Sequence, residues 1–173
     1  MIPDNETHED PPMEYQVASH HLEPQAIVSI RGRIPQDDLP AFIKRAFADL
    51  FGRLRLLGCD PAGPPFVIYH AFGADGIDAE VSVPIATPVV ATGKVESRVL
   101  PAMTVARTLH VGPYEDLGNA YAAVSHWITD HGFTAAGPFQ ERYLNGPGDR
   151  VAPSDYRTEI ELSIVPLVVA APA

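Results

Sequence analysis

Hydrophobic positions along the chain follow two different periods, which predict strands and helices in a regular order. Residues 26–32 are rich in β-branched side chains and lie between Pro24 and Pro35, which is typical of a strand. Residues 37–58 instead carry apolar side chains at three- and four-residue steps, which predicts an amphipathic helix. Two strand-like runs follow at 65–72 and 78–85, joined by the turn "GADG". The first half of the chain therefore reads as strand–helix–strand–strand.

The same order returns in the second half. A strand within 101–114 ends in a Gly-Pro turn, the helical pattern occupies 115–132, and strand patterns occupy 138–144 and 155–165. "GCDPAGP" (58–64) matches "GFTAAGP" (132–138) in form, and "AEVSVPI" matches "TEIELSI", which sets Tyr69 opposite Tyr143 and Glu80 opposite Glu159. Ordered self-similarity of this kind indicates a duplicated module.

The duplication predicts an α+β fold. Two modules, at about 14–86 and 99–166, would join into one curved antiparallel sheet, with both helices on one face and a central ligand groove. Residues 87–99 would cross between the modules and contribute a short strand. Residues 1–13 are acidic and proline-rich, which predicts a disordered tail before a single domain at 14–173.

Charge and composition exclude several classes of function. The 173 residues carry a formal net charge of −10, which disfavours binding to phosphate backbones, so no nucleic-acid partner is predicted. Cys59 is the only cysteine, which excludes an internal disulfide and a cysteine-built metal site. We predict neither a metal nor a cofactor, because no carboxylate–histidine set has ligand spacing. The absence of a signal sequence or membrane span, together with the lone thiol, predicts a cytoplasmic protein without membrane contact.

Acidic residues alternate with apolar ones in the last strand. Glu159 and Glu161 alternate with Ile160 and Leu162, so the two carboxylates share one face of the strand. If Val81, Ile160 and Leu162 pack beneath the helices, then Glu80, Glu159 and Glu161 line a groove on the other face, between the modules. The alternative is that these glutamates belong to a solvated sheet face.

Aromatic residues near these glutamates in the expected strand order are candidate walls of the groove: Tyr69, Phe72, Trp127, Phe139 and Tyr143. A carboxylate in an apolar groove is costly unless it is paired, and a cationic ligand held by aromatic rings would pair it. Trp127 either caps one end of the groove or completes the core. The alternative for Tyr69 and Tyr143 is that they are half-exposed strand residues, which the preference of tyrosine for strands explains without a ligand.

The segments "VARTLHVGPYEDLGNAYAAVSHWITDHGF", "ERYLNGPGD" and "RTEIELSIVP" together resemble the GyrI-like family, over about residues 14–166. This family includes the effector-binding domain found at the C-terminus of multidrug-sensing transcription activators. The resemblance implies a groove that binds lipophilic cations or planar aromatic compounds, with Glu159 as a ligand contact. Some members resemble hydrolases that open cyclopropane rings with a glutamate and a tyrosine, and Glu159 and Tyr143 lie in the matching motifs.

Three functions are consistent with this sequence. The leading expectation is a stand-alone protein that sequesters or senses amphipathic, often cationic, aromatic compounds. The second is a hydrolase of cyclopropane-type electrophiles with Glu159 and Tyr143 as catalytic residues. The third is a protein-inhibitor or interaction module that uses the acidic surface and the tail. Too few residues precede the domain for a helix-turn-helix, so direct transcription control is not expected. No pattern predicts an oligomeric state.

Overall fold

The computed structural model describes residues 14–90 and 92–168, and the predicted tail at 1–13 lies outside the described residues. Eight strands and two helices occur in the order β1 (Ala18–Leu22), β2 (Gln25–Ile34), α1 (Leu39–Leu57), β3 (Phe66–Gly73), β4 (Gly76–Pro84), β5 (Glu96–Leu100), β6 (Met103–Val111), α2 (Leu117–Asp130), β7 (Phe133–Tyr143) and β8 (Arg157–Pro166). The predicted α+β class is confirmed. Neither helix of the described chain is long and apolar enough to span a membrane.

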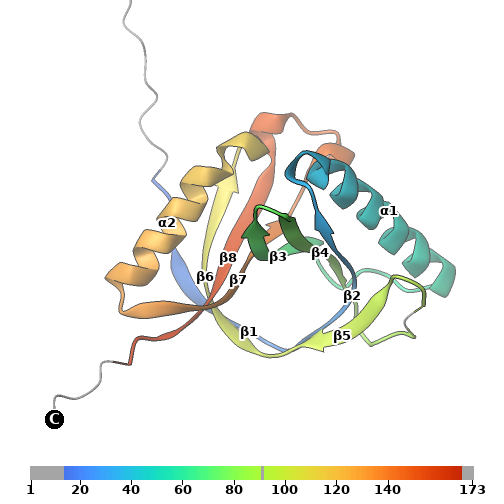
Figure 1. Cartoon of the computed structure of the whole chain (residues 1–173), viewed down its shortest axis with the longest axis horizontal. Helices are drawn as coiled ribbons and strands as arrows, with labels where there is room; N and C mark the ends of the chain where they lie inside the picture. Colours follow the sequence, from blue (N-terminus) through green and yellow to red (C-terminus); the bar gives the residue numbers. More distant parts are fainter. Residues whose placement is uncertain (1–13, 91, 169–173) are drawn as a thin grey trace, which may run out of the picture.

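All eight strands belong to one antiparallel sheet, curled into a half-barrel, with the order β1-β6-β8-β7-β3-β4-β2-β5 (Figure 1). The modules meet where β3 pairs with β7, from Phe66–Arg142 to Tyr69–Phe139. The outer strands cross over between modules. Strand β1 belongs in sequence to the predicted first module but pairs with β6 of the second, whereas β5, which begins in the predicted crossing segment, pairs with β2 of the first.

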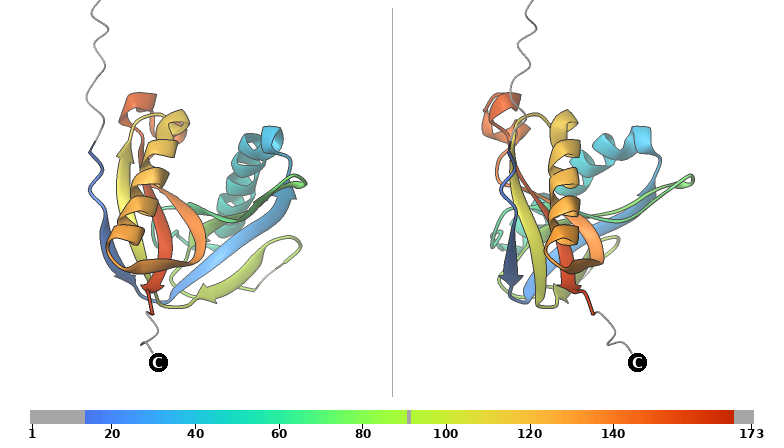
Figure 2. Two further views of the ribbon diagram at one scale, coloured as in Figure 1. Left: turned by 60° about the vertical axis from the view of Figure 1, so that its left-hand side comes forward. Right: turned by 90° about the vertical axis from the view of Figure 1, so that its left-hand side faces the viewer.

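Both helices cover the same face of the sheet (Figure 2). Helix α1 buries Ala46, Leu50 and Leu54 against a cluster that includes Val81, and it ends at Gly58, whose φ of +64° favours glycine. Helix α2 buries its own apolar stripe against Ile160 and other residues of β6 and β8. The expectation that Val81, Ile160 and Leu162 pack beneath the helices is therefore confirmed.

Two β-bulges interrupt the neighbouring strands β3 and β7. Tyr69 pairs with Ala79 and Ala71 with Asp78, so His70 is one extra residue in β3. In β7 the three residues 136–138 oppose the single residue between Leu162 and Ile164. A bulge changes which face the following side chains occupy. The β3–β7 pairing ends at the level of both bulges, and the two modules separate there.

Candidate functional site

Glu141 lies at the junction of the modules, on the face that the helices cover. It pairs across the sheet with Val67, a residue of the core beneath α1, and is only 8% exposed. Three tyrosine hydroxyls donate hydrogen bonds to its carboxylate: Tyr69 at 3.1 Å and Tyr143 at 2.7 Å to Oε2, and Tyr121 at 2.5 Å to Oε1. Strand β3, helix α2 and strand β7 thus converge on one buried acid. The hydroxyls occupy three acceptor positions of the carboxylate.

Among the residues that the structure describes, none supplies a positive partner for the carboxylate of Glu141. Within the two described ranges, no lysine, arginine or histidine nitrogen lies within 4.0 Å of Glu141, whereas Glu80 is paired with Arg98 at 2.6 Å and Glu161 with Arg107 at 2.5 Å. A buried charge is costly unless an opposite charge compensates it. A cation that reached Glu141 would supply the missing opposite charge.

Aromatic rings from both modules surround the carboxylate. Tyr121 meets Phe139 edge-to-face at 4.7 Å, and Phe47 of α1 meets Tyr143 at 6.1 Å with planes 89° apart. The β3 bulge turns Phe72 to the face of Tyr69, where the rings stack at 5.6 Å, and Phe72 stays 63% exposed. Several of these rings are half-exposed, so they can offer π-faces to a cation.

The tyrosines of this cluster resist ionisation. Burial, and next the negative charge of Glu141, raise the pKa values of Tyr69, Tyr121 and Tyr143 well above the ordinary value for tyrosine. Burial, with Tyr156 as the next cause, raises the pKa of the neighbouring Tyr114 to about 12. All four hydroxyls therefore remain protonated donors at neutral pH.

The predicted glutamates lie on the other face of the sheet. Glu80, Glu159 and Glu161 do face away from the helices, as expected, but Tyr69, Phe139 and Tyr143 point toward the helices. The expected pair of Glu159 and Tyr143 is not formed. Tyr143 stands opposite Thr158 in the β7–β8 register, so the next residue, Glu159, projects from the opposite face.

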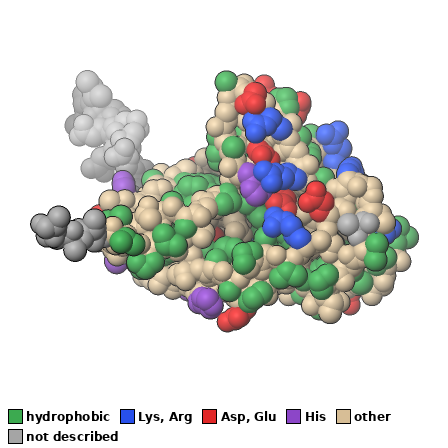
Figure 3. Space-filling view, turned by 60° about the horizontal axis from the view of Figure 1, so that its bottom comes forward, with side chains coloured by type: hydrophobic (Ala, Val, Ile, Leu, Met, Phe, Trp, Pro, Cys, Tyr) green, Lys and Arg blue, Asp and Glu red, His purple; other side chains and the backbone are tan. Residues whose placement is uncertain are grey.

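Arginines neutralise the glutamates on the helix-free face. Glu161 is fully buried beside Arg107 and Arg142, and Glu159 lies 3.7 Å and 4.0 Å from the same two guanidiniums. Burial opposes ionisation of Glu80, but hydrogen bonds from Arg98, Ser29 and His70 outweigh it and lower its pKa. In Figure 3, basic and acidic side chains accordingly form one mixed band on the side of the molecule away from the helices. A cationic ligand would compete there with guanidinium groups already in place.

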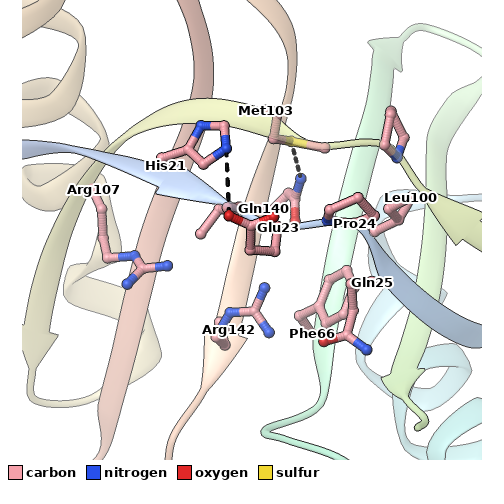
Figure 4. Close-up of a pocket in the computed structure, with 12 residues that line it drawn as sticks. His21, Glu23, Pro24, Gln25, Phe66, Leu100, Met103, Arg107, Gln140 and Arg142 are labelled. Carbon is pink, nitrogen blue, oxygen red and sulfur yellow. Dashed lines mark hydrogen bonds and ion pairs between the residues drawn. The ribbon is translucent and has the colours of Figure 1, made fainter.

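A cavity of about 270 Å³ lies beside these ion pairs (Figure 4). Arg107 and Arg142 line it together with Phe66, Gln140 and Met103, and the segments 21–25 and 100–101 complete its wall. The helix-free face is thus hollowed here, but the cavity is lined by two arginines and Glu23, and not by the glutamates that were predicted from the sequence to line a groove. Over the described residues, no group of three or more histidine, cysteine, aspartate or glutamate side chains could hold a metal ion.

Among the predicted aromatic walls, Tyr69, Phe72, Phe139 and Tyr143 gather around Glu141, whereas Trp127 does not. Trp127 stacks on Phe133 at 5.7 Å and on His131 at 4.3 Å, at the C-terminal end of α2, within the core of the second module. Sequence reasoning missed Glu141 and Tyr121. Strand alternation could have revealed Glu141, because it lies two residues before the predicted site residue Tyr143 and therefore shares its face of the strand.

An acid set among aromatic rings at the junction of two sheet modules is typical of the sites of small-molecule binding domains. The family model described as the GyrI-like small molecule binding domain matches residues 15–165, and the chain belongs to this family. The resemblance inferred from the sequence is thereby confirmed. No curated protein matches the sequence.

Several solved structures share this fold. The C-terminal domain of EcmrR is 24% identical, with a TM-score of 0.79, covering 90% of this chain and 100% of that one. In an EcmrR–DNA complex the identity is 24% and the TM-score 0.77; the match covers 89% of this chain, which spans only 58% of the EcmrR chain there. SAV2435 bound to tetraphenylphosphonium is 19% identical, with a TM-score of 0.62 and coverage of 88% and 94%. A hydrolase from Listeria innocua is 14% identical, with a TM-score of 0.63 and coverage of 87% and 92%.

Proposed function

We propose that this protein binds amphipathic, aromatic cations at the Glu141 cluster and thereby sequesters or senses them in the cytoplasm. The observation that carries the proposal is a buried carboxylate held by three tyrosine hydroxyls, with no cationic side chain within 4.0 Å among the described residues. Glu141 takes the role that sequence reasoning gave to Glu159, whose charge is already balanced by two arginines.

The chemistry of the cluster favours a delocalised cation over a small, strongly hydrated one. Phe139, Tyr143 and Phe47 offer apolar ring faces, and a lipophilic cation gains both stacking and cation–π energy while losing little hydration. SAV2435, which shares the fold, was solved with tetraphenylphosphonium bound, and this cation has the expected character. We therefore choose it as the probe.

Isothermal titration calorimetry with tetraphenylphosphonium tests the proposal, with neutral triphenylphosphine oxide as the matched control. We expect saturable binding of the cation and binding of the neutral compound that is weaker by a factor of about ten or more, which corresponds to at least about 1.4 kcal/mol. Failure of the cation to saturate the protein would refute the proposal. Equal affinity for the two compounds would refute the role of charge.

A hydrolase is the second candidate, and one contact favours it. Tyr143 donates to Glu141 at 2.7 Å, which brings a proton donor and a carboxylate base within reach of one substrate. In this reaction water would form a C–O bond as a ring C–C bond of the cyclopropane breaks; Glu141 would take the water proton, Tyr143 would protonate the carbon released, and Glu141 would return its proton to Tyr143 across their hydrogen bond. Incubation with a cyclopropane-bearing alkylator, followed by mass spectrometry, tests it. A hydrated product that forms with wild type and not with Glu141→Gln supports turnover, and no product above the buffer control excludes it.

A further inference from the structure

A second cavity, of about 450 Å³, lies on the helix-free face at the junction of the modules. Ile68, Leu100 and Met103 supply apolar surface, and Gln140, Ser163 and Thr104 supply neutral polar groups. His70 and Arg98 are its basic residues, and no acidic side chain lines it among the residues that the structure describes. The cavity thus combines apolar surface with basic groups, the opposite polarity to the Glu141 cluster.

The two β-bulges shape this cavity. The bulge in β3 inserts His70, which contributes to the lining, and residues 136–138 of the β7 bulge line it on the side of Ser163. Bulges re-aim side chains and are frequent next to binding sites. His70, the extra residue of β3, directs its ring to Glu80 on this face, with Nε2 2.8 Å from the carboxylate.

The basic groups are held in fixed positions by a buried acid. Arg98 donates to both oxygens of Glu80, from Nη2 at 2.8 Å and 2.6 Å and from Nε at 3.2 Å, and His70 Nε2 lies 2.8 Å from the same carboxylate. The Glu80 side chain is 2% exposed, whereas those of Arg98 and His70 are 39% and 21% exposed. Within the described chain, Arg98 Nη1 and His70 Nδ1 make no hydrogen bond. Glu80 therefore fixes the orientation of both groups and leaves nitrogen atoms of each free for a ligand.

We propose that this cavity is a second binding site, which takes an amphipathic anion with a carboxylate or sulfonate head and a compact apolar body. The planar guanidinium of Arg98 suits such a head, and the apolar lining suits a body of about two fused rings. Glu80 balances one positive charge, so recognition comes from directed N–H donors more than from a broad positive field. This inference does not depend on the proposed function of Glu141.

The smaller cavity offers a poorer site for an anion. Its arginines, Arg107 and Arg142, are already paired with Glu159 and Glu161, and the carboxylate of Glu23 also lines it. Figure 4 shows Glu23 among the side chains of this cavity, with His21 as its partner at 3.8 Å. An incoming anion would meet acid there, which is absent from the described lining of the larger cavity.

Titration with naphthalene-2-carboxylate tests the second site, with neutral 2-naphthamide as the matched ligand. Ala136→Trp places a large ring in the cavity from an exposed position, and Ala135→Trp places the same ring one residue earlier, outside the lining. We expect saturable binding of the carboxylate, little binding of the amide, and a loss of affinity of about tenfold or more in Ala136→Trp only. Equal binding of both compounds, or full binding by Ala136→Trp, would overturn the proposal.

Two further readouts keep the test independent of a damaged fold and of the first site. The methyl NMR signal of Met103, which lines the cavity, should shift on addition of the carboxylate to wild-type protein. His70→Gln keeps a hydrogen-bond partner for Glu80 but removes the imidazole, and it should weaken carboxylate binding. Glu141→Gln should bind the carboxylate like wild type. An unmoved Met103 signal at saturation, or loss of the carboxylate in Glu141→Gln, would assign the binding elsewhere.

Discussion

Three buried glutamates, Glu80, Glu141 and Glu161, are stabilised in two different ways. Glu80 and Glu161 are paired with arginines, which is the usual means of keeping a buried acid in a fold. Glu141 is held by tyrosine hydroxyls alone among the described residues. Hydroxyl donors satisfy a carboxylate without cancelling its charge, and this difference separates a residue that holds the sheet together from one that can attract a ligand.

An alkaline titration should reveal the tyrosine cluster. Because the folded-state pKa values of Tyr69, Tyr121 and Tyr143 are raised, their stabilising contribution is complete below the ordinary pKa near 10 and is lost as pH rises toward the folded values. Tyrosinate absorbance should therefore rise in two phases, the second accompanying unfolding. Glu141→Gln should move part of the second phase to lower pH, because one cause of the shift is removed. A single phase near pH 10 in wild type would contradict the geometry of the cluster.

Acid should weaken the fold through Glu80. Its folded-state pKa is lowered, so its contribution is complete above the ordinary glutamate value and is lost as pH falls through the folded one. Glu80→Gln should destabilise the protein at pH 7 by about 2 to 3 kcal/mol, since Arg98 and His70 lose a buried partner. In urea unfolding, the difference from wild type should shrink well below pH 4.5. Glu159→Gln is the control, with an expected change within about 1 kcal/mol. A constant Glu80→Gln deficit from pH 7 to pH 3 would contradict this role.

At the scale of elements, the hydrophobic periods predicted both helices and the strands of the two modules, because each element buries one face or stripe. They did not predict the pairing of β1 with β6, which joins Ala18–Leu22 to a strand more than eighty residues away. The hydrophobic periods also did not predict the β-bulges in β3 and β7. One inserted residue at His70 changes the face of Phe72 without altering the apolar pattern that a period detects.

Two glycine substitutions should have opposite effects on stability. Gly76 begins β4 with φ at +114°, and an added Cβ would lie 2.7 Å from the carbonyl oxygen of Ile34, so Gly76→Ala should lower the free energy of unfolding by about 1 to 3 kcal/mol. Gly52 lies inside α1 with open space around it, so Gly52→Ala should raise that free energy by about 0.5 to 1 kcal/mol. Thermal and urea unfolding measure both, and a Gly76→Ala variant as stable as wild type would contradict the described hairpin.

At the scale of the whole molecule, strand alternation placed Glu80, Glu159 and Glu161 on the helix-free face as the sequence predicted. Sequence reasoning failed at the next step, when it combined those glutamates with Tyr69, Phe139 and Tyr143, which occupy the other face. Which face binds a ligand depends on partners distant in sequence, such as Arg107 for Glu161 and Tyr121 for Glu141. A single strand pattern contains no information on them.

We propose Glu141, on the helix-covered face, and not Glu159, as the counter-charge for a bound cation. Calorimetric titration of tetraphenylphosphonium into wild type, Glu141→Gln and Glu159→Gln tests it most directly, with the fold of each variant checked by thermal unfolding. We predict that Glu141→Gln lowers affinity by about thirtyfold, or about 2 kcal/mol, because the charge is lost while the rings remain. For Glu159→Gln we predict a change in affinity of less than about threefold, because two arginines already balance the charge of Glu159 in the wild type. Loss of affinity in Glu159→Gln with full binding by Glu141→Gln would contradict the account and place the cation on the opposite face.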